Sequence, residues 1–193
     1  MSYTFPVTRT THPKPKPDQS NLGFGKYFTD HMFIMDYDEG QGWHDARIVP
    51  YQPLELDPAA MVFHYAMESF EGLKAYRGKD GKIRLFRVEE NAKRMIRSAE
   101  GVVMAPVPEE LFIKAVKKAV ELNKDYVPPY ESGASLYIRP LLLGLGEQVG
   151  VKPAPEYLFI VFVSPVGPYF KEGFKPTPMA IMRGYDRAAP LGT

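Results

Sequence analysis

The sequence contains no cysteine among its 193 residues. Disulfide bridges and thiolate metal sites are therefore excluded, and a reducing compartment such as the cytoplasm, where we expect the protein, is compatible with the chain. Histidine is scarce as well: His12, His31, His44 and His64 lack the spacing of metal ligands. We expect ordinary surface or core histidines and no metal site.

An excess of charge of one sign is also absent. The chain has 24 Lys and Arg against 23 Asp and Glu, a formal net charge of +1. No basic face follows from this balance, so we expect no nucleic-acid partner. The longest apolar run, residues 157–163, has seven residues, whereas a membrane-spanning helix needs about 20. The N-terminus lacks the apolar stretch of a signal peptide, and we expect no association with a membrane.

The widespread catalytic motifs are missing too. The sequence has no glycine-rich phosphate loop of the usual spacings, no Gly-x-Ser-x-Gly turn and no His-Glu-x-x-His pair. No function can therefore be assigned from a generic motif.

What the sequence does contain is the composition of a globular protein, with 45% hydrophobic and 24% charged residues. Its length suits one domain and the start of another. Proline and lysine near the N-terminus predict a mobile arm over residues 1–22. Lys, Gly and Pro over residues 171–178 predict a linker between a small domain, 23–170, and the beginning of a larger one, 179–193. The last residues have the pattern of an unfinished loop, so we expect a fragment.

Apolar periodicity predicts a mixed order of strands and helices. Asp80-Gly81 lies between two short strand-like runs and predicts a hairpin. Asp57-Pro58 predicts the start of a helix. Hairpins beside helices are typical of an α+β fold and not of a doubly wound parallel sheet. The expected strands are residues 31–37, 43–49, 73–77, 82–87, 134–143, 157–164 and 179–185, and the expected helices are 59–69, 89–104 and a third after Pro108.

Tyr137 and Arg139 are the first candidates for a functional site. They are two residues apart in a predicted strand whose alternate positions, Leu136 and Ile138, are apolar, so both should lie on one face of the strand. A guanidinium there needs a partner. Two partners are equally open: a carboxylate of this chain, or the carboxylate of a ligand with the tyrosine hydroxyl beside it.

Arg94, Tyr65 and Phe70 stand out less. Arg94 lies off the apolar stripe of its predicted helix, and the helix alone favours a solvent-exposed role. Tyr65 and Phe70 lie in or near the helix after Pro58, where aromatic residues more often belong to a core than to a substrate pocket. On these grounds alone, none of the three is assigned a function.

A set of short strings gives a more specific signal. They are residues 63–65 (FHY), 69–78 (SFEGLKAYRG), 82–87 (KIRLFR), 91–95 (NAKRM), 134–140 (ASLYIRP) and 164–170 (SPVGPYF), together with 24–26 (FGK) and 28–32 (FTDHM) near the start. Taken in chain order from Phe24 to Thr193, these strings resemble those of the class IV aminotransferases, and of the branched-chain enzymes most closely. D-amino acid aminotransferases and aminodeoxychorismate lyases are the alternatives within that family. An alternative of another class is a non-catalytic module that dimerises or binds a partner.

The resemblance implies the fold of the D-amino acid aminotransferase-like, fold type IV enzymes. This chain would be their smaller N-terminal α+β domain, a mixed or antiparallel sheet with flanking helices. The implied cofactor is pyridoxal 5'-phosphate. The implied reaction is a ping-pong transfer of the amino group from leucine, isoleucine or valine to 2-oxoglutarate. The partners would then be small amino acids and 2-oxo acids, in a homodimer or a larger assembly.

The resemblance also assigns residues by position. Arg94 resembles the arginine that binds the cofactor phosphate, a role that suits a guanidinium facing a dianion. Arg139 and Tyr137 resemble residues of the substrate pocket, with Arg139 placed for the distal carboxylate of glutamate. The remaining pocket residues are Tyr65, Phe70 and Tyr169, as a wall for an aliphatic side chain, and Val149 and Val151, as residues lent to the pocket of a neighbouring subunit.

The family's Schiff-base lysine is the main departure. By resemblance it is expected just after Thr193, so no catalytic residue falls within residues 1–193. Lys74, a lysine within a matched string, is interpreted as structural. We therefore expect the 193-residue chain to be inactive alone.

Overall fold

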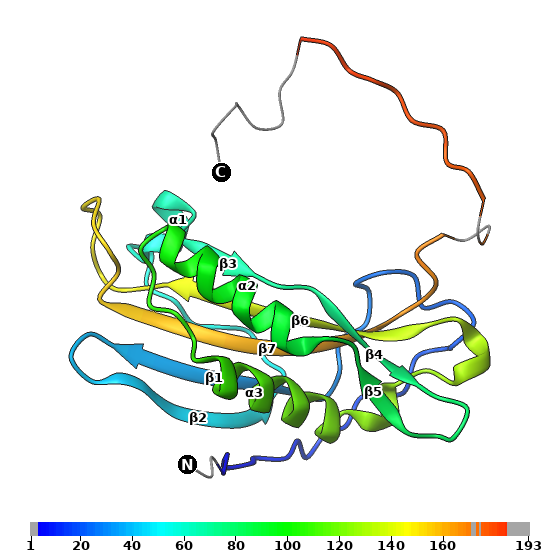
Figure 1. Ribbon diagram of the computed structural model, residues 1–193. Helices are drawn as coiled ribbons and strands as arrows, with labels where there is room; N and C mark the ends of the chain where they lie inside the picture. Colours follow the sequence, from blue (N-terminus) through cyan, green and yellow to red (C-terminus); the bar gives the residue numbers. More distant parts are fainter. Residues whose placement is uncertain (1–3, 171–172, 174, 185–193) are drawn as a thin grey trace.

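The structure is a computed structural model that describes residues 4–170, 173 and 175–184. Its centre is a seven-stranded sheet in the order β2-β1-β7-β6-β4-β5, with β3 paired to β6 off this path. The pairings between the named strands are antiparallel. The strands are β1 (His31–Asp38), β2 (Gly42–Pro50), β3 (Glu68–Phe70), β4 (Leu73–Arg77), β5 (Ile83–Leu85), β6 (Ser135–Gly144) and β7 (Glu156–Val166) (Figure 1).

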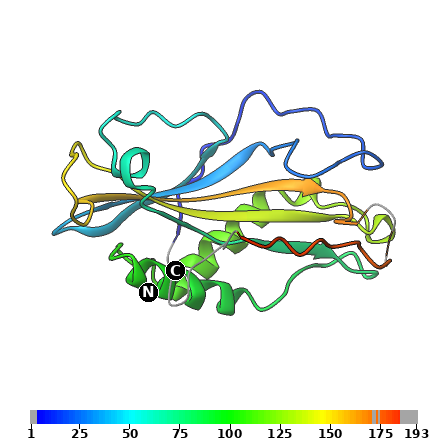
Figure 2. The same ribbon diagram turned by 90° about the horizontal axis from the view of Figure 1, so that it is seen from above.

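Two helices cover one face of this sheet, as the view from above shows (Figure 2). They are α2 (Val88–Gly101) and α3 (Glu109–Leu122), each with two glutamates in its first turn, where negative charge is favourable. A short helix, α1 (Met61–Tyr65), lies on the opposite side. Two single 3₁₀ turns, Lys124–Tyr126 and Tyr130–Ser132, follow α3. No helix of the described residues is long and apolar enough to cross a bilayer.

The main core lies between the sheet and these two helices. Leu136, Ile138 and Leu142 of β6 belong to it and are fully buried. Since strand side chains alternate between faces, the side chains of Tyr137 and Arg139 lie on the other face, as the sequence predicts. Both polar side chains are thereby turned away from the helices, while the apolar positions of β6 stay in the core.

The N-terminal segment follows the sheet. Val7 forms a parallel bridge with Ile48 of β2, the backbone N–H of Lys14 donates to Asp30 Oδ1 at 2.8 Å, and Leu22 is buried. These contacts define where residues 4–22 lie in the structure. The mobility predicted for this arm, like the domain boundaries, stays a prediction.

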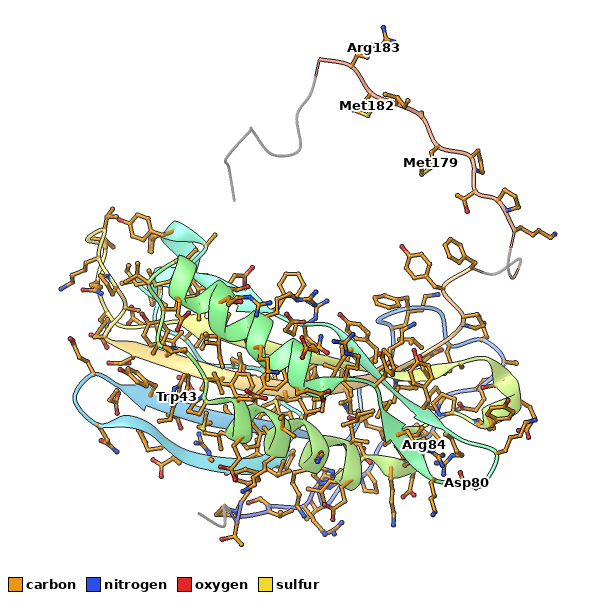
Figure 3. The ribbon with its side chains drawn as sticks, viewed as in Figure 1. Trp43, Asp80, Arg84, Met179, Met182 and Arg183 are labelled. Carbon is orange, nitrogen blue, oxygen red and sulfur yellow. The ribbon has the colours of Figure 1, made fainter. Side chains whose placement is uncertain are left out.

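The α+β fold class is confirmed, but two predicted elements are wrong. The helix predicted over residues 59–69 ends at Tyr65, because Ala66 adopts a left-handed conformation with φ 48°, and Glu68–Phe70 pairs with β6. The strand predicted at 179–185 is absent from its described residues, 179–184, while Tyr185 lies outside them. Met179 and Met182 are largely exposed and lie on a segment that runs clear of the sheet (Figure 3), so no strand of the described residues pairs with them.

Val103, just beyond α2, carries backbone strain that can be relieved. Its φ is 57° and the residue is 65% exposed, and the left-handed region costs an L-residue roughly 1–2 kcal/mol. Val103→Gly is therefore expected to raise the free energy of unfolding by about 1 kcal/mol, since the entropy of glycine offsets part of the gain. The control is Val102→Gly, where φ is −116° and glycine should destabilise. If urea denaturation shows no higher free energy of unfolding for Val103→Gly than for the wild type, the left-handed conformation of Val103 is not a source of strain.

His31 makes the stability of the fold sensitive to acid. Its ring is buried and its Nε2 accepts the backbone N–H of Thr10 at 3.1 Å, which requires the neutral imidazole. Burial lowers the pKa of His31 below 6.5, assisted by Arg9 and Lys16 and opposed by Asp30. The folded pKa is the lower one, so this stability is present above pH 6.5 and is lost as the pH falls through the folded pKa.

We expect the free energy of unfolding to fall between pH 7.5 and pH 5.5 more steeply for the wild type than for His31→Gln, because glutamine does not titrate. Urea denaturation at both pH values measures this change for each protein. Comparing the two changes cancels the contributions of groups that the two proteins share. His12→Gln, at an exposed position, is the control and should keep the wild-type slope. Equal slopes for all three proteins would show that His31 is not the titrating group.

Candidate functional site

The first part of the candidate site is an arginine held by a buried acid. Glu71 follows β3, its side chain is 3% exposed, and its backbone N–H donates to Pro140 O of β6 at 3.0 Å. Its carboxylate accepts Arg94 Nε and Nη2 at 2.6 Å each and Asn91 Nδ2 at 2.8 Å. Asn91 and Arg94 are three residues apart on α2, so they share one face of the helix. The hydrogen bonds and the charge of Glu71 raise the pKa of Arg94, whose side chain stays charged.

The other edge of the Arg94 guanidinium is free to meet solvent. The side chain is 61% exposed, and a guanidinium has more N–H donors than the two that reach Glu71. A depression of roughly 380 Å³ opens beside it, lined by Phe86, Arg87, Glu90, Asn91, Arg94 and Arg97. A concave surface with several arginines suits an anion such as a phosphate group.

The second part of the site is Arg139, which has no acid partner within the described residues. Its Nε and Nη2 donate to Tyr137 Oη at 3.2 and 2.9 Å, and its guanidinium carbon lies 4.3 Å from the ring centroid of Phe70. None of the ion pairs in the described part of the chain involves Arg139. The carboxylate of this chain that the sequence left open as a partner is therefore not found there.

Residues 70–72 connect these two parts. Phe70 contacts Arg139, Glu71 binds Arg94, and Gly72 lies against Tyr137, so close that a Cβ on Gly72 would be 2.6 Å from Tyr137 Oη. A second depression of roughly 360 Å³ is lined by Gly72 and Tyr137 together with Phe86 and Asn91, which also line the Arg94 depression. The two hollows therefore share Phe86 and Asn91, and the contacts of residues 70–72 link Arg94 on α2 to Tyr137 and Arg139 on the other face of the sheet.

The remaining predicted site residues lie elsewhere. Tyr65, the last residue of α1, donates its hydroxyl to the backbone carbonyl of Val149 in the loop between β6 and β7, and Val151 in the same loop is 86% exposed. Tyr169 comes three residues after the end of β7, which lies opposite to the end that joins the β6–β7 loop, and its ring packs against Phe170 with 4.9 Å between the centroids. Within the described part of the chain, the hydrogen bonds and cation–π contacts of the Arg139 side chain are with Tyr137 and Phe70 and not with these residues.

Reasoning from the sequence missed the roles of Glu71, Asn91 and Gly72. All three lie inside strings that carry the family resemblance, but their contacts appear only in the fold. The available signal was Glu71 itself, a charged residue between Phe70 and Gly72 next to a predicted strand. A buried acid requires a partner, and a search for that partner would have pointed to an arginine.

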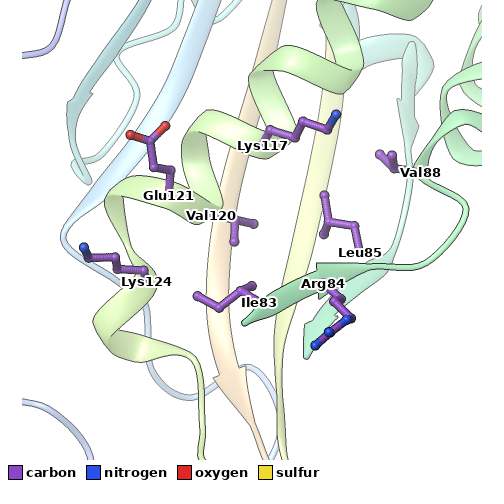
Figure 4. A pocket seen from close by; sticks show the side chains of 8 residues that line it. All are labelled: Ile83, Arg84, Leu85, Val88, Lys117, Val120, Glu121 and Lys124. Atoms are coloured by element: carbon purple, nitrogen blue, oxygen red, sulfur yellow. The ribbon is translucent and has the colours of Figure 1, made fainter. Parts of the chain in front are cut away.

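A larger hollow of roughly 710 Å³ lies outside this site. Val120 of α3 and Ile83 and Leu85 of β5 form its apolar floor (Figure 4). Arg84 at its rim is held by Asp80 at 2.8 Å (Figure 3), and this hydrogen bond lowers the pKa of Asp80 to about 2. None of the candidate site residues lines this hollow.

Comparison with known proteins gives consistent results. No family model matches the chain. It is 51% identical to branched-chain-amino-acid transaminase 1 of Bacillus subtilis over 185 residues, which are 95% of this chain and 52% of that protein. It is 48% identical to the branched-chain-amino-acid aminotransferase of Haemophilus influenzae over 176 residues, 91% of this chain and 51% of that protein. The chain thus spans about half the length of the curated relatives it matches.

Solved structures agree with the sequence matches. The complex of the T.th. branched-chain amino acid aminotransferase with N-(5'-phosphopyridoxyl)-L-glutamate is 26% identical, with a TM-score of 0.54, over 72% of this chain and 41% of that one. The Escherichia coli branched-chain enzyme, at 21% identity, shows the fold alone, with a TM-score of 0.60 over 83% of this chain and 49% of that one.

The described fold is that of the fold type IV, class IV aminotransferases. In sequence the chain is similar to the branched-chain-amino-acid aminotransferases, matched over about half of their length.

Proposed function

We propose that this chain supplies the phosphate-binding arginine and part of the substrate pocket of a pyridoxal-phosphate-dependent branched-chain amino acid aminotransferase. In the proposed ping-pong reaction, leucine, isoleucine or valine gives up its amino group and 2-oxoglutarate receives it. The observation that carries the proposal is Arg139, a guanidinium held by Tyr137 and the Phe70 ring with no acid partner in the described structure. Such a group suits the distal carboxylate of glutamate and 2-oxoglutarate.

The cofactor fits the Arg94 region. Arg94 would bind its phosphate through the N–H groups that do not reach Glu71, with Arg87 and Arg97 lining the same hollow. When bound, pyridoxal phosphate supplies the electron sink for amino transfer, whereas the protein binds and orients the reactants. The chain's own contribution is therefore a fixed anion site, and the relative of known structure that was crystallised with pyridoxamine 5'-phosphate supports this cofactor.

The proposed pocket must accept two kinds of side chain. Phe70 offers an aromatic surface, 55% exposed, on which an aliphatic side chain can pack. Arg139 lies over the same ring, and Tyr137 presents both a ring and a hydroxyl. Leucine would use the rings, whereas glutamate would use the guanidinium. Tyr65 and Tyr169, which lie toward the two ends of the sheet, are proposed as further parts of the wall on the basis of the family resemblance alone.

The proposed assembly is a homodimer or a larger homo-oligomer in the cytoplasm. Val149 and Val151 are 64% and 86% exposed, on a loop that Tyr65 anchors at one end of the sheet. Exposed apolar side chains on an anchored loop suit contact with a second subunit, where they would complete the neighbour's pocket.

The test uses the complete protein and each half-reaction alone. Leucine without an oxo acid should change the visible absorbance of the bound cofactor, and 2-oxoglutarate added afterwards should restore it. This sequence of changes is the signature of ping-pong transfer. An absorbance that responds to neither substrate, in protein shown to contain the cofactor, would overturn the proposal.

A further inference from the structure

Glu71 is a buried acid with an unusual role in the described fold. Its side chain is 3% exposed, whereas that of its partner Arg94 is 61% exposed. An ionised carboxylate is costly to bury unless it is paired and hydrogen-bonded. Glu71 meets this condition through Arg94 and through Asn91. Glu71 is therefore held inside the fold, whereas its partner Arg94 faces the solvent.

We propose that Glu71 is the positioning residue for phosphate recognition: it holds the Arg94 guanidinium by one edge and thereby directs the remaining N–H groups into the hollow beside α2. The inference rests on the proposed function of Arg94 and extends it. Its basis is the paired contact of Nε and Nη2 with the two carboxylate oxygens, because two parallel hydrogen bonds fix a planar guanidinium in both direction and tilt.

The backbone around Glu71 makes this hold rigid. Its N–H donates to Pro140 O, and β3 immediately before it pairs with β6 over Phe70 and Leu141. The sheet therefore sets the position of the carboxylate, and the carboxylate sets the position of Arg94. A long arginine on a helix surface would otherwise lose side-chain entropy on binding an anion, and a preset orientation removes part of that loss.

A charge effect would act in the opposite direction from positioning. The negative charge of Glu71 repels a phosphate, so its removal alone should strengthen phosphate binding. Positioning predicts weaker binding when the paired contact is lost, whatever happens to the charge. Two substitutions separate the effects: Glu71→Gln removes the charge and keeps the shape, whereas Glu71→Asp keeps the charge and withdraws the carboxylate by one methylene.

The experiment measures, in the complete protein, the ratio of the Kd of pyridoxal to the Kd of pyridoxal phosphate, by fluorescence titration. Only the phosphate differs between the two probes. Positioning predicts that both Glu71→Gln and Glu71→Asp lower the ratio by about tenfold, the loss of one charge-assisted hydrogen bond, while the Kd of pyridoxal stays the same. A raised ratio for Glu71→Gln with an unchanged ratio for Glu71→Asp would overturn the proposal and leave a charge effect.

Two further variants complete the test. Glu90→Gln removes an exposed acid from the same hollow and should not lower the ratio. Asn91→Ala removes the third hydrogen bond to Glu71 and should lower the ratio by a few-fold; it replaces the Glu71 variants as the deciding case if these fail to fold. Arg94→Ala separates the proposed phosphate site from the proposed positioning role of Glu71. If Arg94→Ala leaves the ratio unchanged, the phosphate site itself is wrong. If only Arg94→Ala lowers the ratio, the positioning role of Glu71 is wrong.

Discussion

Replacing Arg139 with methionine is expected to lower kcat/KM for 2-oxoglutarate by roughly 10²–10³-fold in the complete protein, and that for the oxo acid of leucine by less than about tenfold. The physical reason is that a guanidinium paired with Tyr137 Oη can receive a carboxylate, whereas methionine cannot. Methionine keeps an apolar surface beside the Phe70 ring, so an aliphatic side chain should still pack there. Steady-state kinetics with both oxo acids measures the difference.

The control for Arg139→Met is Arg84→Met, which replaces an arginine of the neighbouring hairpin held by Asp80. This variant should leave both values of kcat/KM near those of the wild type. Equal losses for the two oxo acids in Arg139→Met would indicate a structural arginine and contradict the assignment of substrate recognition.

Replacing Arg94 with alanine is expected to weaken retention of pyridoxal phosphate by about 10²-fold, because the charged contact with the phosphate is lost. The change also leaves the buried carboxylate of Glu71 with Asn91 alone, which should lower the thermal unfolding midpoint. Cofactor content after dialysis, and unfolding followed in the same samples, measure the two effects.

Arg94→Lys is the informative comparison for Arg94→Ala. Lysine restores a positive charge next to Glu71 but cannot reproduce the two-pronged contact of arginine. We expect the unfolding midpoint to recover more than cofactor retention does. Unchanged cofactor content in Arg94→Ala would show that the phosphate binds elsewhere.

The sequence predicted those features of the fold that depend on local periodicity. Tyr137 and Arg139 share a face because a strand alternates its side chains, and this holds wherever β6 is placed in the sheet. Helices α2 and α3 were predicted because their apolar residues recur at helical spacing, and these residues are buried in the structure. Residues 68 and 69 were misassigned to a helix because Ala and Met nearby favour a helix locally. Pairing with Leu141–Leu143 of β6 overrides that preference, and nothing in the local pattern indicates it.

The candidate site was predicted as a set of residues and not as a set of contacts. Glu71 and Arg94 are 23 positions apart, and Tyr65 and Val149 are 84 apart, so their pairing depends on the completed sheet. The sequence left the partner of Arg139 open between a carboxylate of the chain and one of a ligand. The structure gives it a tyrosine hydroxyl and an aromatic ring, and none of the ion pairs of the described residues supplies it with an acid.

Following the amino group itself measures the proposed transfer between substrates directly. The complete protein, loaded with pyridoxal phosphate, is incubated with ¹⁵N-leucine and unlabelled 2-oxoglutarate, and glutamate is isolated and analysed by mass spectrometry. We expect ¹⁵N-glutamate and the oxo acid of leucine in equal amounts, with glutamate formation reduced in Arg139→Met. If the ¹⁵N-leucine is recovered intact and no ¹⁵N-glutamate is formed by protein that retains its cofactor, the chain is not part of such an aminotransferase.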